Sequence, residues 1–72
     1  MNQAEFDKAM AGTCMPDVSV LVAYEEGDLT DDQLIEMVQH GIDHDWIWQL
    51  QGHYGRLAAN LIESGLCTRM AS

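Results

Sequence analysis

Basic residues are scarce in this chain, and the shortage limits what it can bind. Among 72 residues, three are Lys or Arg and twelve are Asp or Glu, so the formal net charge is −9. Binding to a phosphate backbone normally requires clustered Lys and Arg. The composition therefore disfavours direct nucleic-acid binding and favours attraction to a basic protein surface. Acidity that serves only to keep a small protein soluble is the alternative interpretation.

Cysteines and long apolar runs are also few. The two cysteines, Cys14 and Cys67, are fewer than a small secreted disulfide scaffold usually carries, so we expect free, buried thiols. No run approaches the roughly 18 apolar residues of a membrane span, and the N-terminus lacks the apolar core of a signal peptide. These absences predict a cytoplasmic protein that does not enter a membrane.

The residues that are present predict helices. Glu5 follows Asn2 by three residues, and Gln33 follows Thr30 by three residues; both spacings are typical of a capping box. Gly65 stands where a helix typically ends, with Leu66 placed for an apolar contact. We predict a single all-α domain, a compact bundle of about four short helices. The predicted helices span residues 1–13, 17–26, 30–42 and 46–65, and the predicted frayed tail spans 68–72.

Residues 17–26 are the ambiguous segment. Three valines at alternate positions suit a strand, and β-branched residues favour strands. A helix is favoured by Asp17 as its cap and by Gly27 as its C-terminal stop. The chain also offers no second strand with which this one would pair. We therefore predict a helix, with a strand as the alternative.

A metal site is suggested by the spacing of three side chains. Glu36, His40 and His44 are four residues apart, so they would lie on one face of a continuous helix, and His53 would complete the ligand set. We expect Gly41 to interrupt that helix, however, and the His-Glu-x-x-His pattern of metalloproteases is absent. We therefore predict no metal-binding residues.

Other chemical sites receive less support. Asp28, Thr30 and Asp32 alternate as a calcium loop begins, but no glycine stands at the sixth loop position. Neither cysteine has the local signature of a nucleophile. A chain this short also has little room for a substrate pocket. We therefore predict no catalytic residues, no cofactor and no enzymatic activity.

The stretch from Trp46 to Arg56 holds both tryptophans, two glycines and an arginine. In a helix Trp46 and Trp48 point about 200° apart. One ring is therefore expected to be exposed as an interface anchor, and Trp46 is the preferred candidate. Gly52 and Gly55 predict close approach of another backbone or a tight turn.

Arg56 lies in the first turns of the last predicted helix, where the helix dipole disfavours a cation. We expect a carboxylate of Asp43, Asp45 or Glu26 to compensate, with contact to a partner as the alternative. The predicted partner-binding residues are Trp46, Trp48, Gln51, His53, Tyr54 and Arg56. The predicted acidic patch consists of Glu25, Glu26, Asp28, Asp31 and Asp32.

Two patterns in the chain resemble a family of short proteins encoded by tailed bacteriophages. They are Ala23-Tyr24-Glu25-Glu26-Gly27-Asp28-Leu29-Thr30 and Trp48-Gln49-Leu50-Gln51-Gly52-His53-Tyr54-Gly55-Arg56, followed by Ala58, Leu61-Ile62-Glu63 and Gly65. The resemblance covers residues 20 to 67, and it implies a viral origin, a helical fold and a location in the bacterial host cytoplasm. It supplies no catalytic residues. The chain departs from the family pattern at residues 43–46, where we would expect a Thr-Gly or Ser-Gly turn.

A phage origin favours binding to another protein, since small non-structural phage proteins commonly act in this way. We predict a non-enzymatic binding module that modulates a host or phage protein by protein–protein contact. The alternative is a nucleic-acid mimic that inhibits a host restriction or CRISPR-type defence enzyme. Direct nucleic-acid binding through Gln51, His53, Tyr54 and Arg56 is a weaker third interpretation. A homodimer through the segment around Trp46 and Trp48 is a further hypothesis.

Overall fold

In a computed structural model, which describes residues 1–11 and 16–69, the chain forms four α-helices and one short 3₁₀ helix. No β-strand occurs in these residues, so the all-α prediction is confirmed and residues 18–25 are helical rather than extended. The elements are α1 (Gln3–Met10), α2 (Val18–Glu25), α3 (Asp31–Asp43), the 3₁₀ helix η1 (Ile47–Gln49) and α4 (Gly52–Glu63).

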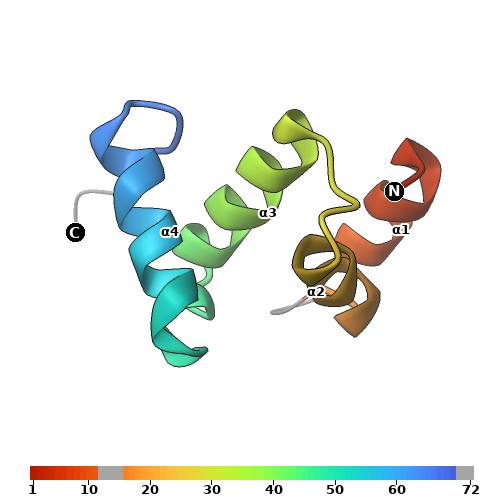
Figure 1. Cartoon of the computed structure of the whole chain (residues 1–72), viewed down its shortest axis with the longest axis horizontal. Coiled ribbons are helices and arrows are strands. Elements are labelled where there is room, and N and C mark those ends of the chain that lie inside the picture. Colours follow the sequence, from red (N-terminus) through yellow and green to blue (C-terminus); the bar gives the residue numbers. More distant parts are fainter. Residues whose placement is uncertain (12–15, 70–72) are drawn as a thin grey trace.

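The longest helix, α3, lies at the centre of the fold. On one side of α3, α1 contacts α3, and α2 packs against α1. On the other side, η1 and α4 both contact α3 (Figure 1). Because each helix contributes apolar side chains to the space between these elements, one continuous core results. Its largest fully buried side chains are Phe6, Val20, Met37, Val38, Ile47 and Cys67.

Asn2, Asp17 and Thr30 cap the first three helices through their side chains. The predicted capping box is found at Thr30 and Gln33, whereas Asn2 caps α1 without the predicted box with Glu5. Asn2 accepts a hydrogen bond from the backbone N–H of Ala4 at 2.7 Å. At the start of α3, the Thr30 hydroxyl accepts from the N–H of Gln33 at 3.1 Å, and the Gln33 side chain accepts from the N–H of Thr30 at 3.0 Å. Gln33 is buried and also donates to the carbonyl of Met1 at 2.8 Å. The predicted capping box therefore also holds the N-terminus against α3.

Residues in the left-handed conformation end three of the helices. Gly27 follows α2 with φ 74°, and Gly65 follows α4 with φ 85°. After α4, the N–H of Leu66 donates to the carbonyl of Leu61 at 2.9 Å, which is the Schellman arrangement that the sequence predicts. The Leu66 side chain, however, is 56% exposed. After α3 the left-handed position is occupied by Asp45, with φ 61°, rather than by glycine.

Gly41 does not end α3, contrary to the prediction. The helix continues through Gly41 to Asp43, and the glycine serves the packing of the next segment instead. A Cβ atom at this position would stand 2.7 Å from the Cβ of Ile47 and 3.2 Å from Cε2 of Trp46. The missing side chain therefore allows the following segment to fold back against the last turns of α3.

The prediction of one helix over residues 46–65 is wrong. The helical conformation breaks at Leu50 and Gln51, whose ψ angles of −175° and 152° are extended. Residues 47–49 form η1, which contacts both α3 and α4, so the break lets the chain pack against α3 before α4 begins at Gly52. The prediction for the first helix is also too long: α1 ends at Met10, and residues 12–15 lie outside the described part of the chain.

The start of the predicted frayed tail is held in place. The N–H of Thr68 donates to Gln39 Oε1 at 2.9 Å, and Gln39 Nε2 donates to the Thr68 carbonyl at 2.8 Å. The guanidinium of Arg69 lies 5.1 Å from the centre of the Trp48 ring. The prediction is therefore wrong for residues 68 and 69, and residues 70–72 lie outside the described part.

Candidate protein-interaction surface

Trp46 belongs to the core, so its assignment as the exposed anchor is wrong. Its side chain is 5% exposed, and its indole Nε1–H donates a hydrogen bond to Nδ1 of His40 at 2.9 Å. The indole fits because Gly41 leaves free the space beside the helix backbone. The prediction from the sequence assumes that residues 46–65 form one straight helix. The chain instead turns between α3 and η1, and this turn places the indole against α3.

Trp48 is partly buried, and it packs beside α4. If Gly55 carried a Cβ atom, that atom would lie 3.8 Å from Cε3 of the Trp48 side chain, which is an ordinary van der Waals distance. No atom stands within 4 Å of the corresponding position on Gly52. The prediction of a close backbone approach at these glycines is therefore wrong. Within the described residues, the buried Nε1 of Trp48 has no hydrogen-bond partner.

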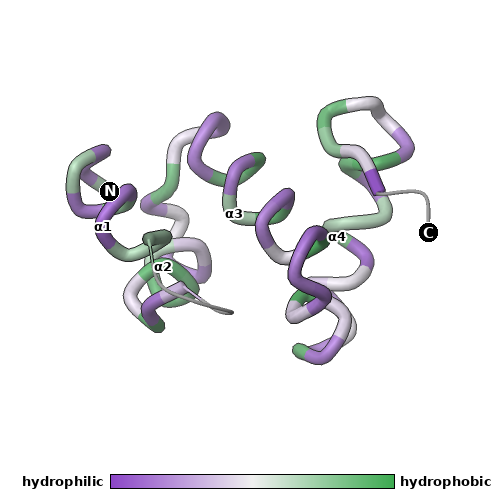
Figure 2. The backbone as a smooth tube through the Cα atoms, turned by 180° about the vertical axis from the view of Figure 1, so that it is seen from behind, coloured by the Kyte–Doolittle hydropathy of each residue, from purple (hydrophilic) through white to green (hydrophobic). Residues whose placement is uncertain are grey.

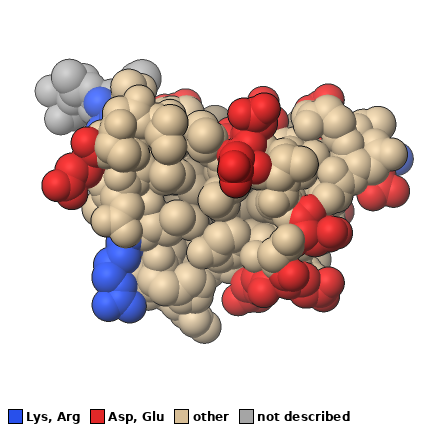
Figure 3. All heavy atoms as spheres, turned by 45° about the horizontal axis from the view of Figure 1, so that its top comes forward, with Lys and Arg blue, Asp and Glu red and all other residues tan. Residues whose placement is uncertain are grey.

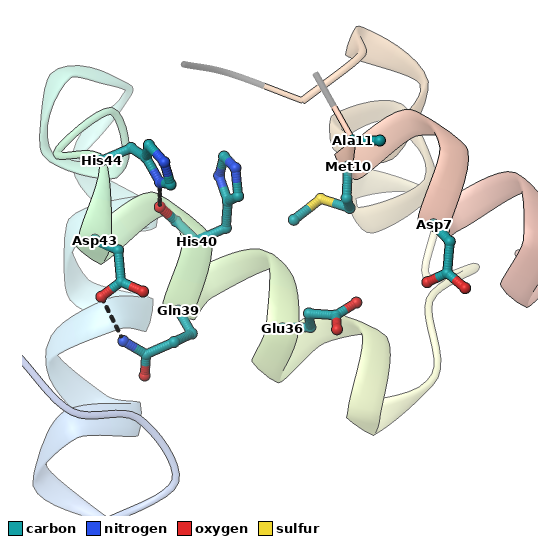
Figure 4. Close-up of a pocket in the computed structure, with 8 residues that line it drawn as sticks. All are labelled: Asp7, Met10, Ala11, Glu36, Gln39, His40, Asp43 and His44. Atoms are coloured by element: carbon teal, nitrogen blue, oxygen red, sulfur yellow. Dashed lines mark hydrogen bonds between the residues drawn. The ribbon is translucent and has the colours of Figure 1, made fainter. Parts of the chain in front are cut away.

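A groove of about 390 Å³ separates α1 from the second half of α3 (Figure 4). Asp7 and Met10 lie on the α1 side, and His40 and His44 lie on the α3 side. The two imidazole rings are stacked with their centres 4.1 Å apart. The complete lining is Asp7, Met10, Ala11, Glu36, Gln39, His40, Asp43 and His44.

Hydrogen bonds assign the tautomers of both histidines. Since an indole N–H can only donate, the Trp46 bond requires an unprotonated Nδ1 on His40, and the proton of neutral His40 lies on Nε2. The carbonyl of His40 can only accept, so Nδ1 of His44, 3.0 Å away, carries a proton. Burial lowers the pKa of His40, and the neighbouring His44 lowers it further, against a smaller opposite effect of Asp43.

This arrangement is poorly suited to a metal ion. Nε2 of His40 would have to lose its proton while Nδ1 still accepts from Trp46. No group of three or more His, Cys, Asp or Glu side chains within residues 1–11 and 16–69 is placed to hold a metal. Cys67 is buried, with its thiol 3.7 Å from the carbonyl of Ile35, and burial raises its pKa. Cys14 lies outside the described residues.

A second groove, of about 550 Å³, lies where the end of α2 meets the start of α4, and it is lined by Tyr24, Glu25, Glu26, Gly27 and His53. We call it the α2–α4 groove. The rings of Tyr24 and His53 are stacked, with an angle of 13° between their planes and 6.5 Å between their centres.

Tyr54 forms the buried support of the α2–α4 groove. Its side chain is 5% exposed, and its ring lies 5.4 Å from that of Tyr24. Burial raises the pKa of the Tyr54 hydroxyl, and the nearby Glu25 carboxylate raises it further. Tyr54 therefore positions Tyr24 and His53 rather than offering a free contact surface.

Gln51 and Arg56 are exposed at the start of α4. Gln51 precedes α4 without making a side-chain cap. The predicted carboxylate clamp on Arg56 is wrong: within the described residues, the one ion pair joins the N-terminal ammonium to Asp28 at 3.7 Å. Of the predicted partner-binding residues, Gln51 and Arg56 are therefore exposed, and His53 and Trp48 are partly exposed.

The five residues of the predicted acidic patch lie in three different parts of the fold. Glu25 and Glu26 line the α2–α4 groove, Asp28 contacts the N-terminus, and Asp31 and Asp32 occupy the first turn of α3. In the face seen in Figure 3, acidic atoms form separate groups with uncharged surface between them. Their arrangement on this face is not a continuous row.

Tyr24 is absent from the predicted partner-binding residues, although it contributes an aromatic ring to the α2–α4 groove. A signal for it exists in the sequence: Tyr24 stands beside Glu25 in the first of the two patterns that carry the family resemblance. The structure brings this pattern into contact with the second one through the rings of Tyr24, His53 and Tyr54.

The profile of a family described as a domain of unknown function, DUF7417, matches residues 13–72. No curated protein and no solved structure matches the chain. Among residues 1–11 and 16–69, no helix has the length and apolar character needed to cross a membrane.

Proposed function

The chain belongs to the DUF7417 family of domains of unknown function, and we propose that it is a non-enzymatic protein-binding module. In this proposal it is encoded by a bacteriophage and modulates a host or phage protein by direct contact. The observation that carries the proposal is the α2–α4 groove, where exposed carboxylates stand beside stacked aromatic rings.

The chemistry of the groove favours a basic partner. Glu25 and Glu26 are exposed and form no ion pair with any residue of the described chain. Residues 9–55 contain no Lys or Arg, so no basic side chain of this long segment neutralises them. A Lys or Arg side chain in the groove would meet two carboxylates, which suit charge pairing, and the aromatic ring of Tyr24, which suits cation–π contact.

Affinity capture with matched variants tests this function. The bait is the full chain, and the retained bacterial proteins are quantified by mass spectrometry. We expect Glu25→Lys/Glu26→Lys to lose the specific partner, since the charge of the groove is reversed. The control is Glu63→Lys, which changes an exposed acid at the end of α4, away from the groove residues. Partners retained equally by all three baits would contradict the role of the groove.

The nucleic-acid mimic is distinguished by the nature of the retained partner. A mimic would retain a nuclease, duplex DNA would displace it, and binding would be lost in about 0.5 M salt, where the Debye length is about 4 Å. Under the proposal, by contrast, DNA does not compete, and Tyr24→Ala weakens binding even at high salt because the aromatic contact is lost.

A further inference from the structure

The outer face of α2 carries apolar side chains that the fold does not use. Val18 is 67% exposed and Val22 is 44% exposed. These positions are one turn apart, Leu21 lies partly buried between them, and Glu25 and Glu26 follow on the same side one turn later. We call this set the α2 stripe: Val18, Leu21, Val22, Glu25 and Glu26.

The core contact of α2 accounts for Leu21, which packs against the core from its partly buried position, but not for the exposed Val18 and Val22. α2 is held by Val20 and Ala23, which are buried at other positions around the helix. Hydrophobic colour therefore runs along most of α2 in Figure 2, whereas α3 alternates between hydrophilic and hydrophobic segments. Valine is also a weaker helix former than alanine or leucine, so exposed valines do not serve helix stability.

Position links the α2 stripe to the groove. Glu25 and Glu26 belong to both, so an apolar surface at the start of α2 continues into the acidic, aromatic groove at its end. Asp17 stands at the other end of the helix as its cap. The apolar positions are therefore enclosed between acids at both ends.

Charge complementarity selects the occupant of this surface. A second copy of the chain would bring like charges together, since each copy has a net charge of −9 and the acids flank the apolar contact. An amphipathic helix with basic residues beside its apolar positions would instead pair its positive charges with the acids at both ends of α2. Such a helix would cover Val18 and Val22 and extend a Lys or Arg into the α2–α4 groove.

We propose that the α2 stripe docks a basic amphipathic helix of the partner protein, an inference that rests on the proposed function. The eight residues of α2 span about 12 Å, which matches only two turns of a partner helix. The contact is therefore small, and we expect a dissociation constant on the order of micromolar.

A defined peptide tests the proposal without knowledge of the natural partner. The probe is a fluorescein-labelled helical peptide of Leu and Lys, with leucines at i, i+3, i+4 and i+7. Its binding to the full chain is followed by anisotropy, and its location by NMR shifts. We expect Val18→Ser/Val22→Ser to weaken binding at least about tenfold, because the apolar contact is removed. Val18→Ile/Val22→Ile is the matched control and should retain binding, and urea denaturation verifies that both variants fold.

The second arm separates this inference from the proposed function. A scrambled Leu/Lys peptide of the same composition lacks the apolar stripe and should bind at least about tenfold more weakly. Equal binding of the two peptides, or equal binding by the serine variant, would overturn the docking inference. If Glu25→Gln/Glu26→Gln still weakened binding, the groove and the proposed function would stand. A dimer that the serine substitutions dissociate would identify a second copy as the occupant and would also overturn the inference.

Discussion

At the scale of single residues, Trp46 shows how a conspicuous side chain serves the interior. Its ring is buried, and its one polar atom donates to His40. We expect Trp46→Ala to reduce the free energy of unfolding by about 3–5 kcal/mol, because a large cavity replaces the ring. Trp46→Phe keeps most of the volume and should lose about 1–2 kcal/mol, the cost of the missing hydrogen bond.

Urea denaturation measures the free energy of unfolding of both Trp46 variants. Neither substitution should change the structure of the α2–α4 groove. The exposed Val18 provides a control, since Val18→Ala should change the free energy of unfolding by less than about 0.5 kcal/mol. A Trp46→Ala protein as stable as wild type would show that the indole is not part of the core.

His40 makes stability depend on pH in a predictable direction. Its folded pKa lies below the unfolded value of 6.5, so the unfolded chain takes up a proton first as pH falls. The contribution of neutral His40 to the free energy of unfolding is fully present above pH 6.5, and it is lost as the pH falls through the folded pKa. Protonation of Nδ1 would also remove the acceptor for Trp46. We therefore expect the free energy of unfolding to decrease as the pH falls from about 6.5 through the folded pKa, a window that begins above the ordinary titration of carboxylates.

NMR titration of the His40 ring verifies the cause. His44→Gln removes the neighbouring imidazole that lowers the pKa of His40 and should therefore raise that pKa, while Asp7, Glu36 and Asp43 still line the same groove. An unchanged pKa in that variant would contradict the electrostatic effect of the stacked pair. In His40→Gln the loss of stability over this pH window should disappear.

At the scale of elements, two glycines in helices should respond to alanine in opposite ways. Gly52→Ala adds a methyl group to open space at the start of α4, so we expect a gain of about 0.4–1 kcal/mol. Gly41→Ala places a Cβ 2.7 Å from Ile47 Cβ, so we expect a loss of about 1–3 kcal/mol. Thermal denaturation of the pair is the measurement, and a stabilised Gly41→Ala would show that η1 does not pack tightly on α3.

At the scale of the whole molecule, charge and burial both disfavour self-association. The dimer hypothesis places the contact around Trp46 and Trp48, and of these two rings Trp46 is buried within one chain, which leaves only part of Trp48 for such a contact. The net charge of −9 adds repulsion between copies. We expect sedimentation equilibrium to give a monomer at about 100 μM, far above ordinary dimer dissociation constants. A dimer that is stable in low salt would contradict this prediction.

Local sequence signals indicate several of the helix ends correctly, because a cap or a left-handed glycine acts within a few residues, whereas the break at Leu50 and Gln51 and the continuation of α3 through Gly41 do not follow from them. Thr30 with Gln33, and Gly65 after α4, are found as predicted for this reason. The helix over residues 18–25 follows from the same kind of signal at Asp17 and Gly27. The all-α fold is therefore a property that the sequence by itself determines.

The candidate site depends on contacts between distant parts of the chain. The sequence indicates that residues 46–56 are unusual and that Glu25 and Glu26 are acidic, but only the fold brings His53 beside Tyr24. The position of Trp46 depends on the space above Gly41 and on the break at Leu50 and Gln51. Helical periodicity specifies the direction of a side chain around its own helix, whereas its burial depends on where the next element packs. That packing, a tertiary property, decides that Trp46 is core and that the α2 stripe is surface.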